Sequence, residues 1–177
     1  MRKALMMFGT LNDTDIDWLT RVGELRRFSA RQPIISERQP IEALFIILDG
    51  RAVVSVRGTE VARAAAGEIL GEVSLVDSRL PTASVVPESE TTVLQIGRSA
   101  LKRKLREDMG FGCRFYHALA IVLAQRLQRN TPSGPQGRVE DSDDVDLADD
   151  VEADLLENVT LAGLRFDQLL RRTMKNG

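Results

Sequence analysis

The segment that decides the fold runs from residue 67 to residue 75 and reads Gly-Glu-Ile-Leu-Gly-Glu-Val-Ser-Leu. Its two glycines stand four residues apart, and the acid Glu72 directly follows the second. Gly71 can bend the backbone tightly or bring it close to a ligand, because glycine lacks a Cβ atom. A helical turn that begins there would direct free N–H groups at an anion. The segment therefore predicts a turn that contacts a ligand.

A second group of small residues follows about ten positions later, where residues 79–85 read Arg-Leu-Pro-Thr-Ala-Ser-Val. Thr82 and Ala83 are small enough to let a ligand lie against the backbone, and Arg79 could pair with a phosphate oxygen. Glu72 suits a ligand that also offers a hydroxyl donor, as a ribose does. The alternative interpretation of Glu72 is a surface acid at the start of a turn.

Short β-branched or alternating runs surround these segments between residues 24 and 97. They cover residues 25–28, 33–36, 43–48, 52–56, 60–64, 83–86 and 91–96. Seven or eight short strands at this spacing predict a small antiparallel sandwich or barrel. The Asp49-Gly50 pair predicts a hairpin between the runs that flank it.

Helices are expected on both sides of the β body. Asn12, followed three residues later by Asp15, predicts the start of a helix over 12–22. Residues 98–107 read as a basic helix, and residues 111–129 as a longer one. The long helix has one stripe that holds Phe115, Leu119, Val122 and Arg126. The fold class is therefore mainly β, with an N-terminal helix and two C-terminal helices.

The chain has one cysteine, Cys113, and one histidine, His117. A single cysteine rules out an intramolecular disulfide, and so few ligands nearly exclude a Cys/His zinc site. The two residues share a face of the long helix among apolar residues, and we interpret them as structural, because catalytic partners usually come from separate elements. We see no nucleophile–base pair or metal cluster, and we expect neither an enzyme nor a metal site.

The charge is unevenly distributed along the chain. The whole sequence carries 24 Lys and Arg against 26 Asp and Glu, yet residues 140–157 hold ten acids and no base. Two Pro and two Gly precede this run within residues 130–137. We expect a domain over residues 1–129, a disordered linker over 130–152 and an amphipathic helix over 153–175. The stripe of that last helix has no obvious partner within the chain, so we expect it to engage another protein or a second copy.

On the residues quoted above, residues 8–129 resemble the cyclic nucleotide-binding domain family. The resemblance also rests on the apolar run and turn glycine at residues 44–50. It implies an eight-strand β-roll, with cAMP or cGMP as ligand and no other cofactor. It further implies that Gly71, Val73 and Ser74 supply backbone contacts, that Glu72 holds the ribose hydroxyl, and that Thr82 and Ala83 face the cyclic phosphate.

Three positions depart from the family pattern. Pro81 stands where the family has the arginine that binds the phosphate, and it brings neither charge nor N–H. Arg79 lies two residues earlier, an offset of about 6.6 Å along an extended chain. Arg31 and Arg38 replace glycines that are common in the family.

Two functional readings therefore stay open. In one, the protein is a non-enzymatic cyclic nucleotide sensor that signals through its C-terminal helices, with Arg79 as a displaced phosphate ligand. In the other, the same fold is a nucleotide-independent scaffold or assembly adaptor. The resemblance also implies that the exposed part of the helix over 111–129 forms the surface of a homodimer. We expect a cytoplasmic protein without a membrane span or DNA partner, because acidic segments repel phosphates and no helix-turn-helix follows the long helix.

Overall fold

The computed structural model describes residues 6–77, 79–130 and 160–174. The described chain opens with two short helices, α1 (Met6–Thr10) and α2 (Asp13–Val22). Asn12 caps α2 as the sequence predicts. Its side-chain oxygen accepts the N–H of Asp15, and the Asp15 carboxylate accepts the N–H of Asn12.

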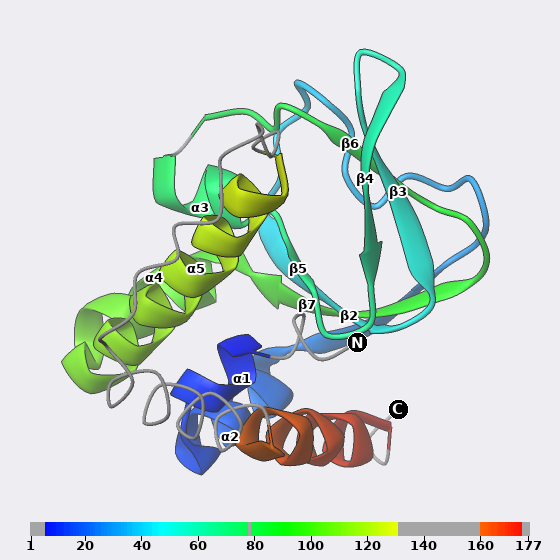
Figure 1. The fold of residues 1–177 in the computed structure, drawn as a ribbon. Coiled ribbons are helices and arrows are strands. Elements are labelled where there is room, and N and C mark those ends of the chain that lie inside the picture. Colours follow the sequence, from blue (N-terminus) through cyan, green and yellow to red (C-terminus); the bar gives the residue numbers. More distant parts are fainter. Residues whose placement is uncertain (1–5, 78, 131–159, 175–177) are drawn as a thin grey trace, which may run out of the picture.

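Seven strands form two antiparallel sheets within the described residues (Figure 1). One sheet has the order β1-β7-β2-β5, from β1 (Glu24–Phe28), β7 (Thr91–Gly97), β2 (Ala43–Asp49) and β5 (Ile69–Leu70). The other has the order β4-β3-β6, from β4 (Thr59–Ala65), β3 (Arg51–Val56) and β6 (Ser84–Pro87). The predicted mainly β class is confirmed.

Strand β2 separates two apolar cores, because its side chains alternate between its two faces. Phe45 and Ile47 pack between the sheets, whereas Leu44 and Ile46 pack beneath the helices. A strand buried on both faces reads as a continuous apolar run, which is what residues 43–48 show in the sequence.

Two local predictions are wrong. The Asp49-Gly50 turn does not close a hairpin, because β2 and β3 belong to different sheets and the turn carries the chain from one to the other. Residues 33–36 form no strand, and only Ile35 makes an isolated bridge, to Val85. The sequence prediction also missed the two-residue strand β5, which is too short to show a period.

Helices α4 (Arg98–Glu107) and α5 (Met109–Asn130) follow the last strand and, with α1 and α2, cover the four-stranded sheet. The predicted stripe of α5 faces inward, with Phe115 and Leu119 buried. The Arg114 guanidinium bonds both oxygens of buried Asp15, at 2.6 and 2.8 Å, and so ties α5 to α2. Cys113 and His117 lie on the exposed side of α5. The expectation that they lie among apolar core residues is therefore wrong.

The C-terminal helix, residues 160–174, packs against the molecule's own α1 and α2 (orange to red in Figure 1). Ala162, Phe166 and Leu169 are buried in the core beneath the helices. Arg165 donates to the carbonyl oxygens of Phe8 and Gly9 at 3.2 and 2.9 Å, where α1 ends. The expectation that this stripe lacks a partner within the chain is therefore wrong.

The remainder of the predicted tail, residues 131–159 with the acidic run and residues 175–177, lies outside the described residues. The predicted domain boundaries at 129 and 153 stay predictions. Within the described part of the chain, no helix combines the length and the apolar character that crossing a membrane requires.

We predict that Phe166→Ala destabilises the whole fold. The Phe166 ring is 7% exposed and lies 5.3 Å from the Phe8 ring, centroid to centroid. Loss of a buried aromatic side chain costs about 3 kcal/mol of unfolding free energy. Urea unfolding measures this cost. The matched control is Leu164→Ala, on the exposed face of the same helix, with an expected change within about 0.5 kcal/mol. Equal small effects for both variants would show that the helix is not part of the core.

Candidate functional site

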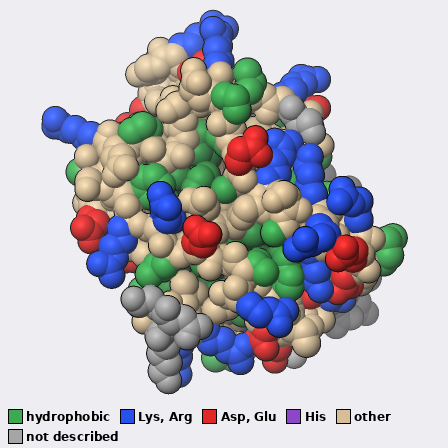
Figure 2. All heavy atoms as spheres, turned by 180° about the vertical axis from the view of Figure 1, so that it is seen from behind, with side chains coloured by type: hydrophobic (Ala, Val, Ile, Leu, Met, Phe, Trp, Pro, Cys, Tyr) green, Lys and Arg blue, Asp and Glu red, His purple; other side chains and the backbone are tan. Residues whose placement is uncertain are grey.

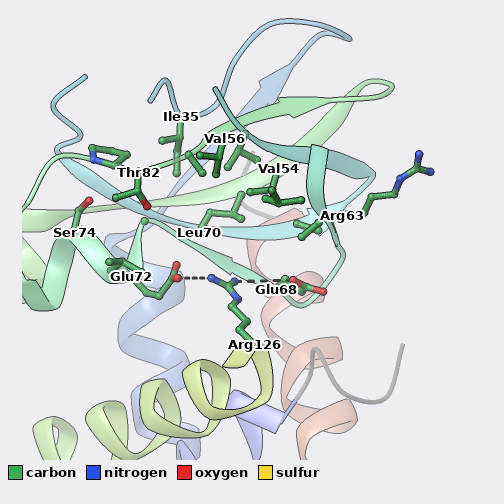
Figure 3. Close-up of a pocket in the computed structure, with 18 residues that line it drawn as sticks. Ile35, Val54, Val56, Arg63, Glu68, Leu70, Glu72, Ser74, Thr82 and Arg126 are labelled. Carbon is green, nitrogen blue, oxygen red and sulfur yellow. Dashed lines mark hydrogen bonds and ion pairs between the residues drawn. The ribbon is translucent and has the colours of Figure 1, made fainter. Parts of the chain in front are cut away.

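A cavity of about 500 Å³ opens between the β-roll and the last turns of α5 (Figure 3). Its walls are mostly apolar and come from strands of both sheets, with Val54, Val56 and Leu70 among them. The short helix α3 (Glu72–Asp77) and residues 81–83 close one end. The two segments singled out in the sequence therefore meet at one cavity.

Gly71 brings the backbone into this cavity in a conformation that other residues rarely adopt. Its φ is +88°, and a Cβ atom there would lie 2.8 Å from the Ile41 side chain and 3.1 Å from the Ala43 carbonyl oxygen. The first helical hydrogen bond of α3 starts here, since the N–H of Leu75 donates to the Gly71 oxygen at 3.2 Å. Glycine permits both the turn and the close approach without steric cost, whereas any other residue would be strained here and would crowd Ile41 and Ala43.

Glu72 follows at the start of α3 and is 2% exposed, so the reading of it as a surface acid is wrong. Burial raises the pKa of its carboxyl above the ordinary value, and the nearby charge of Glu68 acts in the same direction. Arg126 opposes both effects and favours the ionised form. A buried carboxylate needs such a partner, because an isolated charge in the interior is costly.

Arg126 lines the cavity but was not predicted from the sequence to belong to the site. Its guanidinium reaches from α5 into the cavity, bonds the Glu72 carboxylate and the Ile69 carbonyl oxygen, and lies 4.0 Å from a Glu68 oxygen. The available signal was a charged residue on the otherwise apolar stripe of the predicted helix. One arginine thus joins the last turns of α5 to β5 and α3.

The other predicted residues divide into two groups. Val73, Ser74, Thr82 and Ala83 line the cavity together with Gly71 and Glu72. Arg79 does not line it. Its side chain is 79% exposed and pairs with Asp77 at 2.9 Å. The structure thus places the predicted displaced phosphate ligand outside the cavity.

A family model described as cyclic nucleotide-binding domain matches residues 25–108. This range contains the β-roll, α3 and α4. Residues 25–108 therefore form a domain of the cyclic nucleotide-binding family, as the resemblance implied.

Known proteins with similar sequences differ in overall size. A cGMP-dependent protein kinase of Toxoplasma gondii is 28% identical over 102 residues, which are 58% of this chain and 10% of the kinase. The Pycsar effector protein XpPycTIR of Xanthomonas perforans is 26% identical over 160 residues, 90% of this chain and 51% of the effector. The chain thus spans between a tenth and a half of the length of these relatives.

A solved cyclic nucleotide-binding domain from Methylobacillus flagellatus has a similar fold, with a TM-score of 0.65 at 20% identity. The match covers 77% of this chain and 85% of that structure. At this identity the likeness shows the fold alone.

We predict that Arg126→Met destabilises the fold, by about 3 kcal/mol at pH 7, because it leaves Glu72 buried without its partner. Without Arg126 the pKa of Glu72 rises further above the ordinary value of 4.5. The folded state then binds a proton at a pH where Glu72 of the unfolded chain is still ionised. The cost is therefore largest at neutral pH and shrinks as the pH falls toward that ordinary value.

Urea unfolding of wild type and variant at pH 7 and near pH 4.5 measures this difference. Arg103→Met, on the exposed side of α4, is the control and should change stability by less than about 0.5 kcal/mol at either pH. A cost for Arg126→Met that is the same at both pH values would contradict the role assigned to Glu72.

Proposed function

We propose that this protein is a non-enzymatic sensor that binds a cyclic nucleotide, cAMP or cGMP, in the cavity beside Glu72. The observation that carries the proposal is the buried Glu72 carboxylate, 2% exposed, directly after Gly71 with its positive φ and facing a cavity of about 500 Å³. A carboxylate placed there accepts hydrogen bonds from ribose hydroxyls, and the apolar walls of the cavity receive the base.

Binding at Glu72 is coupled to the helices through Arg126. Ribose hydroxyls would share the Glu72 carboxylate with the Arg126 guanidinium, which bonds one of its oxygens. A bound nucleotide therefore changes the contacts that hold the last turns of α5. A second link runs from Arg98, at the start of α4, to the Ser74 carbonyl oxygen at 2.7 Å. Movement of α3 on binding is thus transmitted to α4 as well as to α5.

Calorimetry with cAMP and cGMP on the purified chain tests the proposal. We expect one of them to bind with micromolar affinity, and we expect Glu72→Gln to weaken binding at least about tenfold, because a charge-assisted hydrogen bond is lost. Arg79→Ala is the control. It removes an exposed arginine outside the cavity and should leave the affinity unchanged.

The same titration has a pH signature. The raised pKa of Glu72 means that this carboxyl gains its proton at a higher pH than an ordinary glutamate. As the pH is lowered, the affinity of the wild type should therefore begin to fall while the pH is still above 4.5. The weaker affinity of Glu72→Gln should not show this step. Parallel pH profiles for the two proteins would contradict the role of Glu72 as the hydroxyl acceptor.

The alternative function is that of a nucleotide-independent adaptor. It is favoured by one observation, that neither Pro81 nor Arg79 brings a cation to the end of the cavity formed by Thr82 and Ala83. No binding of either nucleotide up to millimolar concentration would reject the sensor and leave the adaptor.

We further propose that the outer face of α5 pairs with a second copy of the chain. Uncharged residues recur along this face at spacings of three and four: Met109, Cys113, Tyr116, Ala120, Leu123 and Leu127. Three of them are strongly exposed, at 79% for Met109, 51% for Tyr116 and 70% for Leu127. Two identical helices with such a stripe can pack against each other about a two-fold axis.

Sedimentation equilibrium tests this pairing. We expect a dimer for the wild type and a monomer for Tyr116→Glu, because a charge in the middle of the stripe would be buried without a partner. Leu80→Glu is the control, since Leu80 is equally exposed, at 51%, but lies outside α5. A monomeric wild type at tens of micromolar would reject the pairing.

A further inference from the structure

One end of the cavity lacks a cation among the residues that line it. Two arginines belong to the lining, Arg63 and Arg126. The Arg63 guanidinium points away from the cavity, and Arg126 is bonded to Glu72 and Ile69 (Figure 3). At the end formed by Thr82 and Ala83, Pro81 contributes neither charge nor N–H. An anionic ligand with its phosphate at this end needs a cation from elsewhere.

Arg38 is attached to this same edge. Its backbone N–H donates to the Pro81 carbonyl oxygen at 2.8 Å. Its φ is +60°, a left-handed conformation that residues other than glycine rarely adopt. Strain of this kind persists where the surrounding structure enforces it, and it gathers at binding sites.

Hydrogen bonds hold the backbone of the loop that carries Arg38, whereas the Arg38 side chain is held only loosely. The N–H of Glu37 donates to the Ser84 hydroxyl at 2.9 Å, and the Glu37 carboxylate accepts the N–H of Arg57 at 2.8 Å. Like Arg79, Arg38 is not among the residues that line the cavity, and its side chain is 73% exposed with a long contact of 3.8 Å to Glu37. It differs from Arg79 in the hydrogen bond that joins its backbone to Pro81. A firmly placed backbone with a loosely held cation beside Pro81 fits a residue that closes on an anion.

We propose that Arg38 supplies the cation for the phosphate of the bound nucleotide, reaching across Pro81 to the edge formed by Thr82. This inference rests on the proposed function, because it requires an anionic ligand in the cavity. Pro81 provides no positive charge, and Arg38, on the neighbouring loop, then provides it instead.

Surface charge alone does not single out Arg38, since lysines and arginines are spread over the face of the molecule that Figure 2 shows. Arg31 provides a control, because it has the same charge and a similar backbone conformation at a different position. It is also an exposed arginine with a positive φ, +66°, but its N–H donates to Pro87, at the other end of β6. Arg31→Gly therefore removes the same charge and relieves the same left-handed backbone conformation, but at a place away from the cavity.

Calorimetry with cAMP and cGMP on wild type, Arg38→Gly and Arg31→Gly tests the inference, after circular dichroism has shown that all three fold. We expect Arg38→Gly to weaken the better nucleotide at least about tenfold, as loss of a charge-assisted phosphate contact requires, and Arg31→Gly to leave it within about twofold. Equal affinities for the two variants overturn the role of Arg38 alone. No binding by the wild type overturns the proposed function, and this inference with it.

Returning a cation to position 81 gives an independent test. Pro81→Arg should improve binding more in the Arg38→Gly protein than in the wild type, because the two arginines serve the same phosphate. We expect the double variant Arg38→Gly/Pro81→Arg to recover most of the lost affinity. An improvement of the same factor in both backgrounds would show that the two positions act independently, and would overturn the inference.

Discussion

The contact of Arg126 with the Glu72 carboxylate and the Ile69 carbonyl oxygen is the constraint on which the arrangement of the site depends. It places a carboxylate that is 2% exposed beside a cavity and keeps its charge compensated. It also fixes the last turns of α5 to β5 and α3. A ligand that bonds Glu72 would share this carboxylate with Arg126, so we expect its binding to alter the contacts of α5.

The helices that cover the four-stranded sheet are linked to each other by side-chain contacts. Arg114 ties α5 to α2 through Asp15, and Arg165 ties the C-terminal helix to the end of α1. Phe8, Phe111, Phe115 and Phe166 lie in one apolar core beneath these helices. These contacts make α1, α2, α5 and the C-terminal helix one packed layer, through which we expect a displacement at Arg126 to be shared.

Much of the fold follows from local sequence signals, whereas the site required tertiary structure. The Asn12 cap and the bounds of α4 are set by neighbouring residues, and the sequence predicts both. Gly71 and Glu72 likewise locate the predicted ligand-contacting turn within residues 67–75, because they are neighbours in the sequence. The pairing of Arg126 with Glu72 spans 54 positions, so no local pattern shows it. The same holds for the docking of the C-terminal helix and for the contact of Arg38 with Pro81, because each joins segments far apart in the chain.

Hydrogen exchange with and without saturating cAMP or cGMP measures most directly whether the cavity binds a nucleotide and transmits binding to α5. The amides of residues 69–75 and of residues 122–130 should change their exchange rates together, while those of β1, on the opposite edge of its sheet from β5, should not. Unchanged exchange in both segments, or a change confined to residues 69–75, would contradict the coupling of Glu72 to α5 through Arg126.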